Sequence, residues 1–122
     1  MAGFHALALV FGVLVLHAAC KGDDVGKDGT TVGGPCAFSN ECDEDDGSFC
    51  LSDESFPQGT CGKRCATQEQ CPAGSACVNK NSGVCLLSCS GGGDCRENYA
   101  CQSLENQDGT GQSSVCMALP NP

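Results

Sequence analysis

Apolar side chains form one long run in this chain, at its start, and only short stretches after it. Residues 6–16 are an eleven-residue apolar segment. That is the length of a signal-peptide core and is too short to span a bilayer, which needs about twenty residues. After Cys20 there is no amphipathic helical period, so long helices are not expected. In residues 77–85, turn formers separate two short strands. The pattern predicts small β-hairpins joined by irregular segments.

Cysteine spacing divides the rest of the chain into repeats. Of the thirteen cysteines, Cys20 stands apart, and the other twelve form three sets of four in which the first gap is always five residues. An even twelve is typical of a disulfide framework. The disulfide cysteines are assigned as Cys36, Cys42, Cys50, Cys61, Cys65, Cys71, Cys77, Cys85, Cys89, Cys95, Cys101 and Cys116. We expect a small disulfide-rich, mostly irregular fold with short β-hairpins, in three tandem four-cysteine units at 36–64 (unit 1), 65–88 (unit 2) and 89–122 (unit 3).

The pairing of these cysteines is not fixed by their spacing. Four cysteines allow three pairings in each unit. We favour first to third and second to fourth, which ties the short first loop across the predicted hairpin.

Disulfides must substitute for a large hydrophobic core in this chain. After Cys20 there is no Trp and there are few long aliphatic side chains, so the apolar area available for burial is small. We expect the units to be strung in line. Three leucines are predicted at the contacts between units, Leu86, Leu87 and Leu119. Three aromatic residues are predicted to cluster in unit 1, Phe38, Phe49 and Phe56.

Small residues follow the apolar run and lead to Cys20. The segment Ala18-Ala19-Cys20 resembles the lipobox of bacterial lipoprotein signals, although His17 stands where that motif usually has leucine. The resemblance implies a signal peptide at 1–19 and acylation of Cys20, which would anchor the protein stably in a membrane. Lys21, rather than Asp, then favours the outer membrane of the cell envelope. The alternative is an ordinary secretory signal, with Cys20 as a spare thiol.

Residues 20–35 are expected to form a lipid-anchored flexible tether. They are rich in Gly and Asp, and Val25 and Val32 are their only large apolar side chains. Such a segment buries too little apolar surface to fold by itself. The pair Asp23 and Asp24 is interpreted as part of a solvated linker rather than as a cation site.

Two units share the spacing of two successive five-residue gaps, as in Cys65-Cys71-Cys77. With this spacing, residues 34–116 resemble the cysteine-rich repeats of bacterial surface lipoproteins and, loosely, the N-terminal cysteine-rich region of the Dickkopf signalling antagonists. The adjacent cysteines of the later Dickkopf pattern are missing here, so receptor antagonism is not inferred. The Cys-x-Cys step of EGF-like modules is also missing.

The composition argues against several kinds of function. A net charge of -9 and few aromatic residues argue against binding to nucleic acid. His5 and His17 both precede Cys20, so the mature chain has no histidine to act as a general base or zinc ligand. We therefore assign no catalytic residue and no cofactor, and expect that the protein is not an enzyme.

Two metal sites were considered and neither is assigned. Twelve thiolates could bind a soft metal, but Cys-x2-Cys pairs are absent and export favours oxidation. The acidic segment 41–47 could contact calcium, but it fails the EF-hand template, which needs Gly at Asp46 and Glu at Ser52.

The leading interpretation is a non-enzymatic, lipid-anchored extracytoplasmic protein that serves as a binding or envelope module. Its partners would be the membrane, through the lipid on Cys20, and a protein or envelope ligand. The alternative is a secreted inhibitor or toxin-like scaffold that acts through a hairpin loop, at 52–58 or 103–112. A thiol-metal or redox protein is the third hypothesis.

Overall fold

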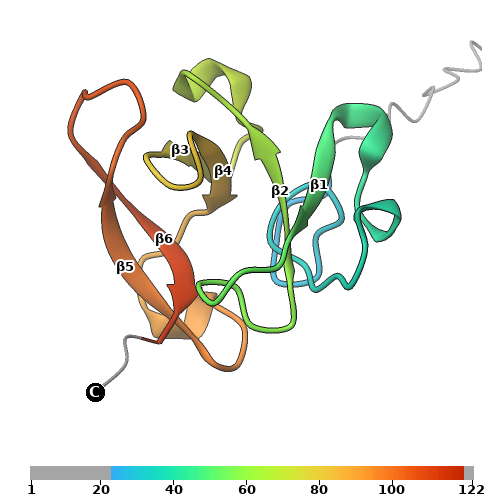
Figure 1. Ribbon diagram of the computed structural model, residues 1–122. Coiled ribbons are helices and arrows are strands. Elements are labelled where there is room, and N and C mark those ends of the chain that lie inside the picture. Colours follow the sequence, from blue (N-terminus) through green and yellow to red (C-terminus); the bar gives the residue numbers. More distant parts are fainter. Residues whose placement is uncertain (1–22, 120–122) are drawn as a thin grey trace, which may run out of the picture.

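The computed structural model describes residues 23–119, and the three cysteine units are coloured green to red along the chain in Figure 1. The expected fold class is confirmed, because the described part has short antiparallel hairpins, short 3-10 turns and six disulfides. The strands are β1 (Ser48–Leu51), β2 (Thr60–Arg64), β3 (Ser75–Val78), β4 (Val84–Leu87), β5 (Tyr99–Glu105) and β6 (Gln112–Ala118). The 3-10 helices are η1 (Ser39–Glu41), η2 (Glu44–Asp46), η3 (Gln68–Gln70) and η4 (Gly92–Asp94).

Each unit repeats one design, a 3-10 turn between its first two cysteines and a hairpin between its last two. The third and fourth cysteines stand directly opposite each other in the hairpin, as Cys77 and Cys85 do in unit 2. They therefore project from one face of the hairpin, and each bonds back to the segment that carries the first two cysteines. The disulfides are Cys36–Cys50, Cys42–Cys61, Cys65–Cys77, Cys71–Cys85, Cys89–Cys101 and Cys95–Cys116. This is the pairing favoured from the sequence.

The polar residue before the second cysteine fixes the first loop of every unit. In unit 1 the Oε1 of Glu41 accepts hydrogen bonds from the backbone N–H groups of Ala37 (2.9 Å) and Phe38 (3.0 Å). Gln70 and Asp94 do the same in units 2 and 3. The side chain thus satisfies two backbone donors at the start of a turn, which is the function of a capping residue.

A left-handed residue lies three positions before the third cysteine of each unit. Gly47, Gly74 and Asn98 have φ angles of 83°, 87° and 69°. Gly and Asn are the residues that adopt this conformation most readily. These residues redirect the chain between the second cysteine and the first strand of the hairpin.

Units 1 and 2 share one sheet and unit 3 packs against both, so the expectation that the units are strung in line was wrong. β1, β2, β4 and β3 form one four-stranded sheet across units 1 and 2, in that order, and β5 and β6 form a separate ribbon. The pairing of Arg64 with Val84, which joins units 1 and 2, is repeated as a bridge between Ser88 and Val115, which joins units 2 and 3. Unit 3 also contacts unit 1, since the Ala118 N–H donates to the carbonyl of Ser55.

One apolar core lies where the three units meet. Its main cluster takes Leu51 and Phe56 from unit 1, Val84 and Leu86 from unit 2, and Val115 from unit 3, among others. No single unit has enough apolar residues to build its own core, and a core shared by three units solves this problem.

The predicted aromatic cluster of unit 1 and the predicted leucine contacts each form only in part. Phe56 is 1% exposed and Phe38 is 71% exposed, while Phe49 packs at the edge of the core. Leu86 is fully buried, but Leu119 is 56% exposed.

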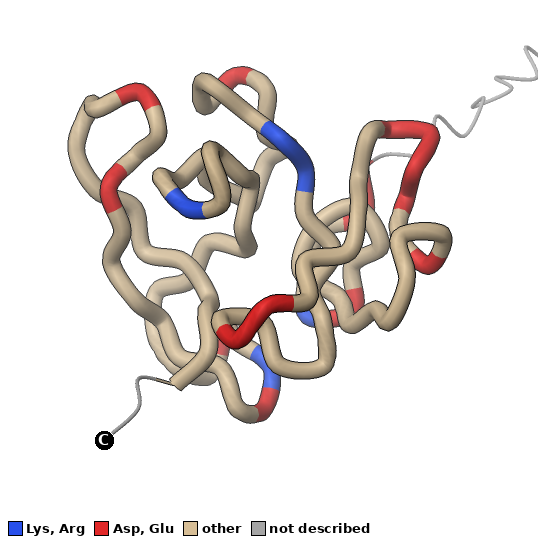
Figure 2. The backbone as a smooth tube through the Cα atoms, in the orientation of Figure 1, with Lys and Arg blue, Asp and Glu red and all other residues tan. Residues whose placement is uncertain are grey.

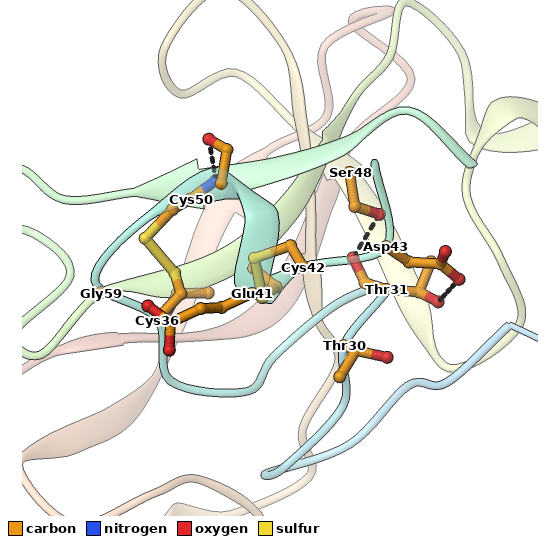
Figure 3. The surroundings of a disulfide bond; sticks show 12 residues. Thr30, Thr31, Cys36, Glu41, Cys42, Asp43, Ser48, Cys50 and Gly59 are labelled. Atoms are coloured by element: carbon orange, nitrogen blue, oxygen red, sulfur yellow. Dashed lines mark hydrogen bonds between the residues drawn. A yellow bond between two sulfur atoms is a disulfide. The ribbon is translucent and has the colours of Figure 1, made fainter. Parts of the chain in front are cut away.

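The N-terminal segment 23–35 is packed against units 1 and 2, so the prediction of a flexible tether was wrong for these residues. Val32 and Thr31 are fully buried. The Gly33 N–H donates to the carbonyl of Cys61, and the Cys61 N–H donates to Gly34. Figure 3 shows Thr31 beside Asp43 and accepting a hydrogen bond from the Ser48 hydroxyl at 2.9 Å.

This segment supplies the strand partner that unit 1 would otherwise lack. In unit 2, the residues just before Cys65 pair with the second strand of the hairpin. In unit 1, residues 33–34, just before Cys36, pair in the same way with the second strand of its hairpin. The segment therefore covers the open end of the array, as terminal caps do in other repeat proteins.

Candidate functional site

The cysteines assigned from the sequence fall into two groups in the structure. Cys20 lies outside the described residues. The twelve others are all paired, and in each unit the sulfurs of the first, second and fourth cysteines lie within 4.8 Å of one another. Since these sulfurs are joined as disulfides, none is a thiolate that could bind a soft metal in this oxidised form.

The acidic segment 41–47 is held by local contacts. The Glu41 carboxylate caps the first loop, and the Asp43 carboxylate lies 3.5 Å from the Thr31 hydroxyl. Within residues 23–119, only cysteines form a group of three or more potential metal ligands. The segment therefore acts as part of the unit 1 framework.

The two loops considered as binding tips differ in accessibility. Residues 52–58 fold back into the interface between units 1 and 3, with Phe56 buried in the core and the Pro57 carbonyl accepting a hydrogen bond from the Tyr99 hydroxyl at 2.9 Å. In the other loop, residues 108–112 are exposed. The 52–58 loop exposes residues 52–54 and Gln58 but is tied to the core by Phe56, whereas residues 108–112 are exposed without interruption.

A polar network also fixes unit 3 against unit 1. The Arg96 guanidinium donates to the Gly59 carbonyl, the Thr60 hydroxyl and the Tyr99 hydroxyl, and stacks 4.5 Å from the centre of the Tyr99 ring. Burial raises the pKa of the Tyr99 hydroxyl, which therefore remains a neutral hydrogen-bonding group. The network has a structural role, because the polar groups of Arg96, Thr60 and Tyr99 form hydrogen bonds with one another and with nearby backbone carbonyls.

The tip of the third hairpin is an ordered turn. The Asp108 Oδ1 accepts hydrogen bonds from the Thr110 backbone N–H (3.0 Å) and hydroxyl (2.5 Å). The Gly109 N–H donates to the Asn106 carbonyl, and the Asn106 N–H donates to Gly111. These bonds hold an exposed loop in one conformation, which lowers the entropy that it would lose on binding a partner.

A polar cleft of about 340 Å³ lies between this tip and the edge of β3. Its walls carry hydroxyl, amide and carboxylate groups, and its lining residues include Gln68, Ser75, Ser88, Asn106 and Asp108. The volume falls within the range of small-ligand sites. The Gln68 amide already occupies the backbone edge of β3 inside this cleft, so the cleft can hold small polar groups but not an added strand.

Acid is expected to loosen the hairpin tip. Hydrogen bonds from Thr110 hold the pKa of the Asp108 carboxyl below its ordinary value, because they favour the ionised form. Their contribution to stability is present above the unfolded-state pKa and is lost as the pH falls through the lower folded-state pKa. NMR should show faster exchange of the Thr110 amide over that acid range. In Asp108→Asn, which accepts the same bonds without titrating, the transition should be absent, and its persistence would contradict this account.

The surface is acidic on several sides. Figure 2 shows Asp and Glu distributed over loops of all three units, with few Lys and Arg between them. This distribution agrees with the net charge of -9.

Comparison with protein-family models, with curated proteins and with solved structures finds no match in any of the three. The class of the protein therefore rests on its own structure, that of a small extracellular cysteine-rich module, because disulfides at this density form and persist in oxidising compartments. Among residues 23–119, no helix has both the length and the apolar character needed to cross a membrane.

Proposed function

We propose that this protein is a lipid-anchored extracytoplasmic binding module that carries out no catalysis. The observation that carries the proposal is a closed body in which three units, each cross-linked by its own disulfides, pack around one core. It offers a rigid surface, an ordered exposed tip and no histidine after Cys20. Such a body suits recognition better than proton-transfer chemistry.

An anchored molecule would sit close to the membrane. Asp24, four residues after Cys20, is hydrogen-bonded to Thr31 in the packed body, and an extended chain spans about 3.5 Å per residue. The lipid on Cys20 would thus hold the body within about 14 Å of its attachment point. Unit 1 and segment 23–35 lie on one side of the molecule, and β5 lies on the opposite side (Figure 1), so anchoring would leave unit 3 accessible.

Metabolic labelling tests the anchor. When the full reading frame is expressed in a bacterium and labelled with palmitate, we expect the wild type to carry the label and to partition with membranes. Cys20→Ala should lose both properties, because it lacks the sulfur that would form the thioether. Cys20 belongs to none of the six disulfides, so the fold should be unaffected. Equal labelling of the two proteins would exclude lipid anchoring.

The second candidate function is a secreted inhibitor that acts through the third hairpin. It is favoured by one observation, the ordered and exposed turn at Asp108 and Thr110. The same labelling experiment separates the two candidates, because a secreted inhibitor is released without palmitate.

A further inference from the structure

The first strand of each hairpin has an outer edge that faces away from its partner strand, and in units 1 and 2 a side chain covers it. The Ser39 Oγ accepts a hydrogen bond from the Cys50 N–H at 3.1 Å. The Gln68 carboxamide accepts from the Cys77 N–H at 3.1 Å and donates to the Ser75 carbonyl at 2.8 Å. Ser39 and Gln68 occupy the same repeat position, three residues after the first cysteine. The Gln68 amide thus substitutes for one peptide group of a neighbouring strand.

Unit 3 has Gly92 at this repeat position, so it has no side chain with which to cover β5. A Cβ built at Gly92 would meet nothing within 4 Å, so this position has room for a side chain. Cys101 is half-buried and Ser103 is exposed. No partner is found among the described residues for the backbone N–H and C=O groups of these two residues on the outer edge.

The register of the ribbon sets the direction of these groups. Ser103 stands opposite Ser114, whose carbonyl bonds outward to the Cys89 N–H. Ser103 is therefore in a non-hydrogen-bonded pair, and its own N–H and C=O point away from β6. Cys101 lies two residues earlier in the same strand and has the same orientation. The outer edge of β5 thus presents a short row of unpaired donors and acceptors.

The charges around this edge indicate what would pair with it. Unit 3 contains four acidic residues, Asp94, Glu97, Glu105 and Asp108, and a single base. That base, Arg96, bonds to neutral groups at the interface with unit 1. Glu97 and Glu105 are exposed at the two ends of β5. The edge is therefore flanked by negative charge that only a cationic partner would complement.

We propose that the outer edge of β5, from Cys101 to Ser103, docks an extended basic segment of a partner polypeptide by strand addition. An open sheet edge is a template for such pairing, in which main-chain hydrogen bonds supply affinity and the flanking charges supply specificity. A second copy of this chain fits the edge poorly, because each copy has a net charge of -9 and like charges would meet.

The test introduces at Gly92 a side chain that can bond to the outer edge of β5. Gly92→Gln introduces the carboxamide that Gln68 supplies in unit 2, and Gly92→Ser introduces the hydroxyl of Ser39. Gly93→Gln is the matched control, because it adds the same side chain one residue later, also into open space. The full chain, exported and oxidised, is titrated with a short labelled peptide that alternates lysine and threonine and with its glutamate–threonine counterpart. Binding is followed by fluorescence anisotropy and by exchange of the Cys101 and Ser103 amides.

We expect the lysine–threonine peptide to bind and to slow exchange of both amides, and the glutamate–threonine peptide not to bind. Gly92→Gln should weaken binding by about tenfold or more, equivalent to about 1.4 kcal/mol, and Gly93→Gln should leave it within about twofold. Failure of the basic peptide to bind, equal binding to Gly92→Gln, or dimerisation of the free protein through this edge would each overturn the proposal. If Gly92→Gln does not fold, the same comparison is made with Gly92→Ser, which should also weaken binding of the basic peptide.

The inference names a partner class for the binding module proposed above, and its failure can be distinguished from failure of the anchor. Peptide binding is measured in solution and does not depend on acylation of Cys20. Loss of palmitate labelling would leave the edge intact, and loss of peptide binding would leave the anchor intact.

Discussion

Reduction of the disulfides is expected to unfold the whole protein. The six bonds close loops that span between 12 and 21 residues of sequence separation, and closing a loop of about fifteen residues is worth about 3 kcal/mol in the chain-entropy model. Domains of ordinary stability are held by only about 5–15 kcal/mol in total. The core that remains is small and divided among three units. We therefore expect the reduced chain to lose amide shift dispersion and to become sensitive to proteases.

The experiment compares oxidised protein with protein treated with a mild thiol reductant at neutral pH, by amide NMR spectra and limited proteolysis. Alkylation should count all twelve paired cysteines after reduction and none of them before it. Re-oxidation should restore the spectrum. Retention of a dispersed spectrum by the fully reduced and alkylated chain would show that packing alone holds the fold, contrary to this account.

Replacement of Phe56 by alanine is expected to cause the largest loss of stability from a single apolar substitution. Phe56 is 1% exposed and lies in the cluster shared by all three units. Removal of a buried phenylalanine ring typically costs about 3–5 kcal/mol. The loss should appear as a lower midpoint of guanidinium unfolding, measured with the disulfides intact.

Phe38→Ala is the matched control, because it removes the same atoms from a ring that is 71% exposed. Its effect should remain within about 0.5 kcal/mol. If Phe56→Ala does not fold oxidatively, Phe56→Leu fills part of the site and should show a smaller loss in the same direction. Similar midpoints for the Phe56→Ala and Phe38→Ala proteins would mean that the interface between units 1 and 3 contributes little to stability.

The local design of each unit could be predicted from the sequence. Cysteine spacing marked the three repeats, and turn formers between the third and fourth cysteines marked the hairpins. The polar residues Glu41, Gln70 and Asp94 were visible as a repeated feature, although their capping contacts were not predicted. A Gly or Asn three residues before each third cysteine was a further repeated signal, and it identifies the left-handed turn into each hairpin.

The arrangement of the units could not be predicted in this way. Proximity in the sequence suggested that Phe38, Phe49 and Phe56 would cluster. The 52–58 loop instead carries Phe56 into the shared core, while Phe38 remains on the first loop in solvent. Segment 23–35 has the composition of a linker, but Val32 is buried because unit 1 needs a partner for its hairpin. Both outcomes depend on contacts between distant parts of the chain.

The candidate edge on β5 needed both kinds of information. The sequence contains Gly91-Gly92-Gly93 where units 1 and 2 have side chains, but the sequence alone does not show what those side chains do. The structure shows what the side chains of Ser39 and Gln68 do at the same repeat position. Gly92 therefore became informative only through comparison of the three units.

Oxidised sulfur, a three-unit repeat and short hairpins follow from the chain itself, because cysteine spacing and turn-forming residues act over a few positions. Tertiary structure alone decided that the units close around one core, that segment 23–35 covers the open end, and that one strand edge is left bare. These features depend on which surfaces meet, and burial of apolar area and pairing of backbone groups are settled only when distant segments come together.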